Sequence, residues 1–240
     1  MMAVAERARG ERLHQAIARR LGTAILAGEV APGTSLEGEI AQAEALGVSR
    51  TPYREALKIL VAKGLLESRP RTGTRVTERR RWNLLDPQVL EWMFAGEPDT
   101  ALVDDLFELR GIIEPAAAAL AARRRTSEQL AAMDAALRDM ARFGLACAEG
   151  RSADQRFHHE LFNASGNSPL ASLSSTIGAA VNLTTTFKAR ASKTPRDAQE
   201  EHRAVLDAIV EGDGEKARQA MQTLLANAHR DMKPDSSTKP

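Results

Sequence analysis

Apolar residues recur at helical spacing along most of the chain, and no long strand-like run interrupts them. The first stripe predicts a helix over residues 12–27, which Gly28 ends. From Asp99 onward the pattern stays helical, with Pro115 as a candidate break in the first helix. Short connections make an all-α bundle the expected architecture of this second half. Its six predicted helices cover residues 99–123, 126–148, 152–164, 168–191, 195–212 and 213–230.

Residues 36–76 carry a different pattern, in which a tight turn joins two helices. Gly47 lies in that turn, where a Cβ would restrict the backbone. Ser49 is the expected N-cap of the second helix, and Pro52 falls in its first turn, where a missing N–H costs nothing. The apolar stripe predicted for this helix consists of Ala56, Leu57, Leu60 and Val61.

The start of this second helix is basic and hydroxyl-bearing, and a short basic hairpin follows it. Arg50, Thr51 and Arg54 lie on faces that the apolar stripe leaves free, as a recognition helix in a DNA major groove requires. The hairpin turn carries Arg71 and Gly73, which suit a wing that approaches phosphates or a minor groove. The pattern predicts a winged helix-turn-helix. A helical hairpin with a solvated charged end is the alternative, and the wing weighs against it.

The segment between the two halves holds both tryptophans and a short predicted helix, with Asp86 and Pro87 as its N-cap and first residue. Trp82 and Trp92 are expected to pack at the domain boundary rather than bind a ligand. The resulting division is a flexible N-terminus (1–10), a winged helix-turn-helix domain (11–78), a linker with a short helix (79–98), an all-α domain (99–232) and a disordered tail (233–240).

Charge is distributed unevenly along the 240 residues. Residues 1–81 carry 15 Lys and Arg against 9 Asp and Glu, a net charge of +6, whereas the rest carries −5. A basic first part on an acidic body suggests a polyanionic partner for that part alone. The single Cys147 excludes an intramolecular disulfide and fits a reducing cytoplasm. Without an apolar signal segment or a run of membrane-spanning length, the protein is expected to be soluble and cytoplasmic.

The sequence GVSRTPYREAL at 47–57, followed by GLL at 64–66 and GTRV at 73–76, resembles the winged-helix domain of GntR-superfamily transcription regulators. One recognition helix per chain makes few base contacts, so a homodimer on a palindromic operator in double-stranded DNA is expected. Two positions depart from the family pattern. Gln42 stands where a core Leu is usual, and Ile40 stands where some members carry a DNA-contacting Arg.

The second half resembles the FCD ligand-binding domain of the FadR branch of this superfamily. The matching stretches are FELRGIIEP at 107–115, DQRFH at 154–158 and EHRAVLDAI at 201–209. The segment RWNLLDPQVLEW at 81–92 is similar to that of galactonate-operon repressors, which sense a sugar acid. The resemblance therefore implies a small carboxylate effector, with an aldonate such as galactonate as the specific expectation.

Asp154, His158 and His202 are the candidate metal ligands. Asp154 and His158 lie one helical turn apart and share a face, whereas His202 lies on another helix. Spacing alone favours a surface pair and a satisfied polar residue, but the resemblance implies a divalent ion such as Zn²⁺ or Ni²⁺. Metal-binding members usually place a third His on the last helix, where this chain has Leu224. His229 lies further round that helix and should face elsewhere.

Arg110 lies on an otherwise apolar helix face and has two interpretations. It forms a salt bridge with Glu114 or Asp105, or its guanidinium clamps the carboxylate of an effector. The resemblance favours the clamp.

These patterns favour a DNA-binding transcription regulator, most simply a repressor that a sugar acid releases from its operator. A regulator that responds to another small carboxylate (lactate, a dicarboxylate or an amino acid) is the alternative. A metal-dependent enzyme on the bundle has less support, because the sequence holds no His-Glu-x-x-His, nucleophile elbow or Gly-rich phosphate loop. A purely architectural DNA binder would not need so large an acidic bundle.

Overall fold

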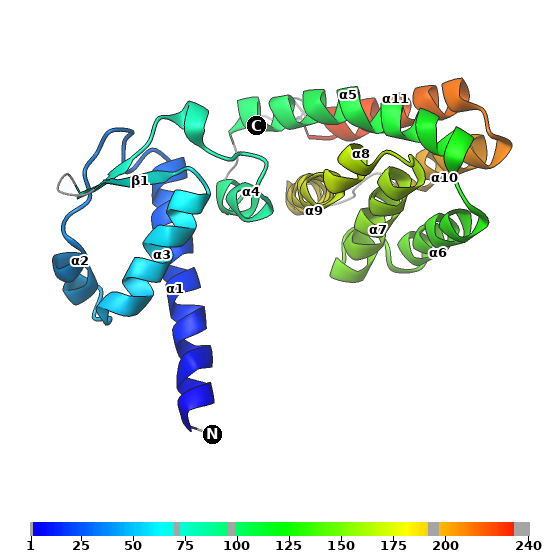
Figure 1. Ribbon diagram of the computed structural model, residues 1–240. Helices are drawn as coiled ribbons and strands as arrows, with labels where there is room; N and C mark the ends of the chain where they lie inside the picture. Colours follow the sequence, from blue (N-terminus) through cyan, green and yellow to red (C-terminus); the bar gives the residue numbers. More distant parts are fainter. Residues whose placement is uncertain (1, 70–72, 96–98, 192–196, 233–240) are drawn as a thin grey trace, which may run out of the picture. The chain divides into compact units, whose positions relative to one another are not determined.

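The chain forms two compact units, Met1–Glu97 and Pro98–Pro240. The computed structural model describes residues 2–69, 73–95, 99–191 and 197–232 (Figure 1). The predicted disordered tail, residues 233–240, lies outside the described residues. None of the helices within those ranges combines the length and the apolar character that a membrane crossing requires.

The first part of this unit packs helices α1, α2 and α3 beside a two-stranded hairpin (Figure 1). These elements are α1 (Met2–Leu26), α2 (Glu39–Ala45), α3 (Arg50–Ala62), β1 (Leu66–Arg69) and β2 (Gly73–Val76). The strands pair antiparallel with Leu66 opposite Val76, and both side chains are buried. This is the winged helix-turn-helix that the sequence predicts, although α1 begins at Met2 and therefore ten residues before the predicted start.

Helix α3 occupies the predicted position of the recognition helix and differs from expectation in two details. Gly47 before it has φ +63°, the left-handed conformation that favours glycine. Ser49 is the N-cap by position, but its side chain makes no capping hydrogen bond. Val61, which the apolar pattern assigns to the buried stripe, is 39% exposed. The buried stripe begins one turn earlier because its members follow the i, i+3, i+4, i+7 spacing: Tyr53, Ala56, Leu57 and Leu60.

The segment predicted to be a linker belongs to the first unit. It forms the 3-10 turn η1 (Arg79–Arg81) and helix α4 (Pro87–Met93), which packs on α1. Trp82 and Trp92 are buried in the same hydrophobic core as the winged helix. The ring of Trp92 lies against Gly22, where an added Cβ would overlap it. The tryptophans therefore complete the core of the first unit. The sequence pattern predicts a place at the domain boundary instead.

Gly64 follows α3 in a conformation that leaves no room for a side chain. Its φ is +74°, and an added Cβ would run into the backbone carbonyl of Arg81. Gly33 has a similar φ of +85° but open space around it. Gly33→Ala is expected to cost about 1–2 kcal/mol of unfolding free energy, the conformational term alone. Gly64→Ala should cost distinctly more, because the clash adds to that term. Urea unfolding of both variants measures the difference, and equal losses would contradict the close approach.

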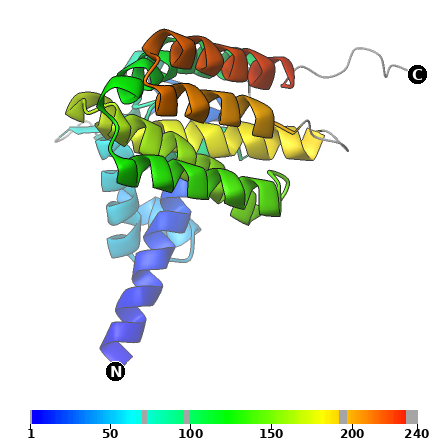
Figure 2. The ribbon, with the colours of Figure 1, turned by 90° about the vertical axis from the view of Figure 1, so that its right-hand side faces the viewer.

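The second unit is a bundle in which the helices lie side by side (Figure 2). Helix α5 packs on α11, α7 and α10, and α7 also packs on α6 and α9. Their shared core is rich in Ala, Leu, Met and Phe. The helices are α5 (Thr100–Arg124), α6 (Ser127–Phe143), α7 (Ala148–Ala164), α8 (Ser168–Ser172), α9 (Ser174–Ala191), α10 (Gln199–Glu211) and α11 (Gly214–Arg230).

The bundle differs from the predicted set of helices at several boundaries, and α10 begins at Gln199, four residues after its predicted start. The fourth predicted helix is divided at Leu173 into α8 and α9. Helix α5 runs unbroken through Pro115, which is buried. Helix α6 ends five residues early, at Phe143, because Gly144 adopts φ +71°. Helix α7 then begins at Ala148, behind Cys147 as its N-cap.

Candidate functional site

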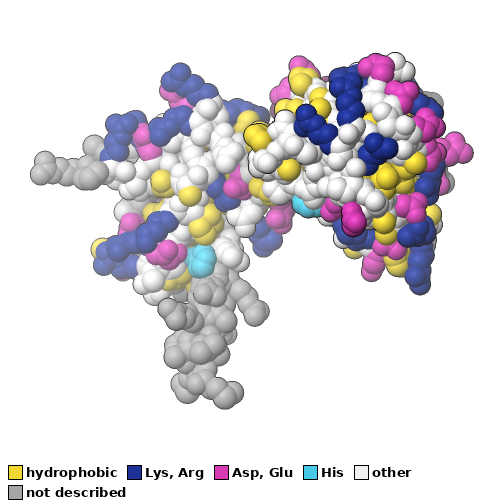
Figure 3. All heavy atoms as spheres, turned by 45° about the vertical axis from the view of Figure 1, so that its right-hand side comes forward, with side chains coloured by type: hydrophobic (Ala, Val, Ile, Leu, Met, Phe, Trp, Pro, Cys, Tyr) yellow, Lys and Arg dark blue, Asp and Glu magenta, His cyan; other side chains and the backbone are white. Residues whose placement is uncertain are grey.

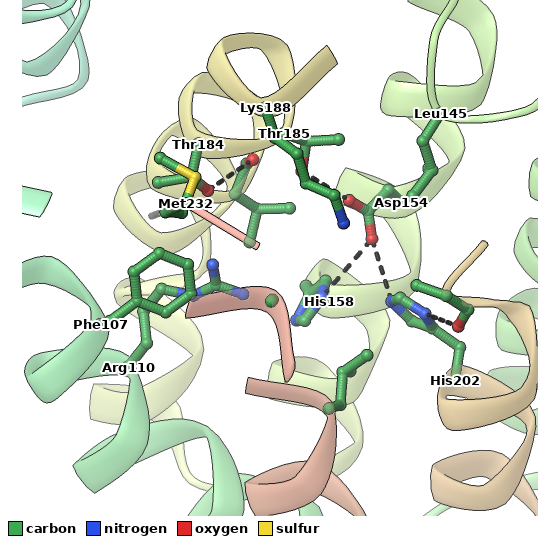
Figure 4. A pocket seen from close by; sticks show the side chains of 14 residues that line it. Phe107, Arg110, Leu145, Asp154, His158, Thr184, Thr185, Lys188, His202 and Met232 are labelled. Carbon is green, nitrogen blue, oxygen red and sulfur yellow. Dashed lines mark hydrogen bonds and ion pairs between the residues drawn. The ribbon is translucent and has the colours of Figure 1, made fainter. Parts of the chain in front are cut away.

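Asp154, His158 and His202 meet inside the second unit (Figure 4). Asp154 and His158 come from α7, and His202 comes from α10. Asp154 Oδ1 lies 3.1 Å from His202 Nε2 and 3.6 Å from His158 Nε2. All three side chains are buried, and one ligand atom of each lies within 4.8 Å of the others. They form a cluster and not the surface pair that spacing alone favours.

Groups behind the two imidazoles fix how the rings are turned. His158 Nδ1 is 2.6 Å from Glu114 Oε2, and His202 Nδ1 is 2.7 Å from the carbonyl oxygen of Ala198. The Nε2 atoms of both rings are therefore directed at Asp154. The hydrogen bond behind His202 and the ion-pair contact behind His158 give each imidazole a partner at its far nitrogen, as metal-binding histidines have.

Arg110 of α5 is paired with Glu114 and also lines the cavity beside the cluster. Arg110 Nε lies 2.6 Å from Glu114 Oε1, with the two side chains 5% and 0% exposed. The salt-bridge interpretation of Arg110 is therefore confirmed. This salt bridge uses only some of the five N–H donors of the guanidinium. Figure 4 shows the guanidinium pointing toward His158, so donors remain on the cavity side.

Charges compensate one another across this network. Burial alone would raise the pKa of Glu114, but Arg110 and His158 outweigh burial and lower the pKa to about 2. Burial alone would lower the pKa of His158, but the carboxylates of Glu114 and Asp154 raise it to about 9. The pKa of Asp154 is held far below its usual range, because the two imidazoles beside it, those of His158 and His202, outweigh its burial. Both ring nitrogens of His158 face carboxylates, so a metal ion that binds Nε2 would have to replace a proton there.

A cavity of about 50 Å³ adjoins the cluster. A cavity of about 10–15 Å³ suffices for one water molecule, so this cavity has room for several waters or a small ligand. A ligand there contacts the residues that line the cavity. Besides the cluster and Arg110, that lining includes Phe107, Thr184, Thr185, Lys188, Leu224 and Met232.

Leu224 lines the cavity where the resemblance implies a third imidazole, and it is only 3% exposed. His229 faces elsewhere, as predicted. Its ring stacks on Phe107, and its Nε2 lies 2.6 Å from Asp104 Oδ1. The cluster therefore offers one carboxylate and two imidazoles. A divalent ion held by these three ligands would keep coordination positions open for water or a small molecule.

The predicted DNA-contacting residues of α3 lie at its exposed start. Arg50 and Thr51 are exposed. The side chain of Arg54 is 53% exposed, and its Nη2 lies 3.0 Å from Glu39 Oε2 of α2. Gly73 begins β2 with φ +80° and open space around its Cα. Arg71 lies outside the described residues.

The two departures from the family pattern lie on α2. Ile40 is 51% exposed, so the position that carries a DNA-contacting Arg in some members presents an apolar side chain. Gln42 donates a hydrogen bond to Glu37 Oε2 at 3.0 Å and is half-buried. It therefore does not act as a buried apolar residue in the way that a core Leu would. Ala43 supplies the buried residue of α2.

The wing contains a charge cluster that sequence reasoning missed. Glu67 of β1 pairs with three arginines: its Oε2 lies 2.7 Å from Arg81 and 3.3 Å from Arg69, and its Oε1 contacts Arg75. Hydrogen bonds from Arg81 and Arg75 lower the pKa of Glu67 to about 2. Cross-strand pairing of Glu67 with Arg75 was the signal available in the sequence. Figure 3 shows Lys and Arg side chains gathered on the visible face of the first unit.

Two family models match the chain in the two units. Residues 13–76 match the model described as bacterial regulatory proteins, gntR family. Residues 105–227 match the model of the FCD domain. The matches coincide with the winged helix-turn-helix and with the helical bundle.

Three curated relatives extend over nearly the same length. The uncharacterised HTH-type transcriptional regulator YieP of Escherichia coli is 37% identical, over 89% of this chain and 92% of that protein. The galactonate operon transcriptional repressor of the same organism is 34% identical, over 89% and 93%. The HTH-type transcriptional regulator LutR of Bacillus subtilis is 32% identical, over 83% and 92%. All three are transcription regulators, and none is described as an enzyme.

A solved structure gives the same picture of the fold. Lar of Listeria monocytogenes, described as controlling expression of the agr system, aligns with a TM-score of 0.65 at 22% identity. The alignment covers 91% of this chain and 95% of that one. At this identity the likeness shows the fold alone.

Proposed function

Since this chain belongs to the gntR family of bacterial regulatory proteins and carries an FCD domain, we propose that it represses a sugar-acid catabolic operon and leaves its operator when an aldonate such as galactonate binds. As a member of that family it is a ligand-responsive, DNA-binding transcription regulator. The proposal adds the chemical class of the effector, the sign of regulation and the residues that act.

The observation that carries the proposal is the meeting of Arg110 with the Asp154, His158 and His202 cluster around one cavity. An aldonate has a carboxylate at one end and a hydroxyl on the adjacent carbon. The planar guanidinium of Arg110 suits the carboxylate, because two parallel N–H donors match its two oxygens. The neighbouring hydroxyl then lies toward the imidazoles or an ion that they hold.

We propose that the cluster holds a divalent ion, Zn²⁺ or Ni²⁺. One carboxylate oxygen and two imidazole nitrogens are a donor set that both ions accept. His158 Nδ1 contacts Glu114, which is itself paired with Arg110, and this support behind the imidazole favours the same assignment. Such an ion supplies positive charge that attracts carboxylate and hydroxyl oxygens, and the effector completes its coordination in place of a third His.

The small cavity favours a second candidate effector. In a cavity of about 50 Å³ a short hydroxy acid such as lactate needs less of the available space than a six-carbon aldonate does. Lactate offers the same carboxylate and adjacent hydroxyl. The two candidates therefore differ in size and not in the chemistry that recognises them.

A mobility-shift experiment on the DNA next to the gene tests the proposed function. The full-length protein is added to that DNA with galactonate, gluconate, lactate or no acid. The proposal expects a shifted band that galactonate abolishes at concentrations at which the other acids have less effect. Release by lactate alone would replace the aldonate by the shorter acid, and a shift that no acid changes would overturn the effector proposal.

The protein is expected to be a homodimer on a palindromic operator. One α3 helix per chain reaches few base pairs, so useful specificity needs a two-fold partner. Multi-angle light scattering should give twice the chain mass of 26.0 kDa, both free and per operator. A monomer that binds a single operator tightly would contradict this.

Arg50→Ala and Arg54→Ala are expected to weaken operator binding while the fold and effector binding persist. Loss of one bidentate base contact costs about 1–3 kcal/mol and relaxes specificity at that base. Glu39→Gln is the matched control for Arg54, because it removes the salt bridge to α2 and keeps the guanidinium. Fluorescence anisotropy on operator and scrambled DNA measures the effect. Unchanged affinity in both arginine variants would refute the proposed docking of α3.

A further inference from the structure

A further cationic side chain reaches the cavity from α9. Lys188 of α9 lines the cavity, and its side chain is only 12% exposed. Its Nζ lies 2.6 Å from Oδ2 of Asp231, the residue that follows α11. Figure 4 shows the Lys188 side chain directed toward the space between Thr185 and His158. The proposed function gives this lysine no role.

Arg110 and Lys188, which both line the cavity, are held differently. Glu114, the partner of Arg110, is fully buried and is also in contact with His158, so that pair is locked inside the bundle. Asp231, the partner of Lys188, is 21% exposed and sits at the end of a helix. A carboxylate at a partly exposed helix end can return to water at low cost, whereas a buried one cannot. Lys188 is therefore the cation whose partner can be exchanged.

Charge balance then decides what the lysine accepts. While Asp231 neutralises Lys188, a neutral hydroxyl gains little by competing for the ammonium, since a charged acceptor is replaced by an uncharged one. A second carboxylate on a ligand would have to take the place of Asp231, so it would lose its hydration while one ion pair is only exchanged for another. With Asp231 in place the cavity therefore suits a ligand with one negative charge.

We propose that the Lys188–Asp231 pair sets the charge of the ligand that this cavity accepts: Asp231 restricts the cavity to monocarboxylates, and without Asp231 the lysine becomes a site for a second carboxylate. The inference rests on the proposed function for the location of the ligand. It adds the determinant by which an aldonate is distinguished from the corresponding dicarboxylate.

Calorimetric titration of the full-length protein tests the inference with two matched ligand pairs. Galactarate is galactonate with a second carboxylate at the far end, and malate is lactate with a second carboxylate. The variants are Asp231→Asn, Lys188→Met and the double variant. Lys216→Met is the control, because Lys216 makes a 2.7 Å pair with Glu211 that is exposed and does not line the cavity. Thermal melting confirms that each variant is folded.

Asp231→Asn is expected to bind a dicarboxylate about tenfold or more tightly than the native chain does, with little change for the matching monocarboxylate. Lys188→Met and the double variant should lack this gain, and Lys216→Met should behave as the native chain. A purely structural ion pair would instead shift both ligands of a pair by the same factor. That result, or a gain that persists in the double variant, overturns the inference.

The inference and the proposed function fail separately. If the native chain binds neither galactonate nor lactate, the proposed effector class is wrong. The gain of dicarboxylate binding in Asp231→Asn still decides the role of the pair in that case, and its absence with both galactarate and malate overturns the inference.

Discussion

Leu224→His is expected to bind Zn²⁺ or Ni²⁺ at least about tenfold more tightly than the native chain. The side chain at 224 lines the cavity beside Asp154, His158 and His202, so an imidazole there can supply a fourth protein ligand. Loss of an outer partner of a metal ligand already costs about 10–100-fold in affinity, and a gained direct ligand should be worth at least the lower value. A site closed by four protein ligands also leaves less room for an effector.

Competition with a chelating dye measures the metal affinity, and thermal melting with and without the ion gives a second readout. Without metal the new buried imidazole should lower stability by about 1–3 kcal/mol. Leu225→His is the matched control, since Leu225 is equally buried but does not line the cavity. An equal gain in both variants, or none in Leu224→His, would show that the cluster is not a metal site.

Arg110→Ala and Arg110→Lys are expected to separate stability from induction. Alanine leaves the fully buried Glu114 without its guanidinium, and breaking a buried pair costs about 3–5 kcal/mol. The cationic His158, also in contact with Glu114, should keep the loss near the lower value. Lysine keeps the charge and the fold but cannot present the planar fork that matches a carboxylate.

Urea unfolding should therefore show a large loss of stability in Arg110→Ala and a small one in Arg110→Lys. Operator binding by Arg110→Lys should match the native chain, while galactonate should no longer release it at concentrations that release the native protein. The promoter would then stay repressed. Release of Arg110→Lys at native galactonate concentrations would remove Arg110 from the effector site.

The sequence predicted the architecture because local signals and burial agree along most of the chain. Helical spacing located the bundle, and the turn at Gly47 located α3. The misplacement of Val61 has a simple cause. An apolar residue eight positions after Tyr53 lies at the edge of the stripe, and only packing decides whether that edge is covered. Trp82 and Trp92 likewise needed the partner surface on α1 to be assigned to the first unit.

Only part of the candidate site can be predicted from the sequence. Asp154 and His158 share a helix face, so their spacing and the family resemblance together identify them as candidate metal ligands. The sequence predicts Glu114 only as a salt-bridge partner of Arg110. Its contact with His158 could not be predicted, because it joins two different helices. The sequence does not predict the role of Lys188 for the same reason, since its pair with Asp231 spans 43 residues. Pairs of this kind carry no local spacing signal.

The measurement that tests the central claim most directly is a pair of titrations on the same samples. Operator affinity is measured with and without saturating galactonate, and galactonate affinity is measured with and without operator. Effector release requires a coupling free energy of about 1–3 kcal/mol, which corresponds to a factor of about 5–150 in affinity. Because coupling is reciprocal, both titrations must give the same factor. Tight galactonate binding that operator DNA leaves unchanged would contradict the account.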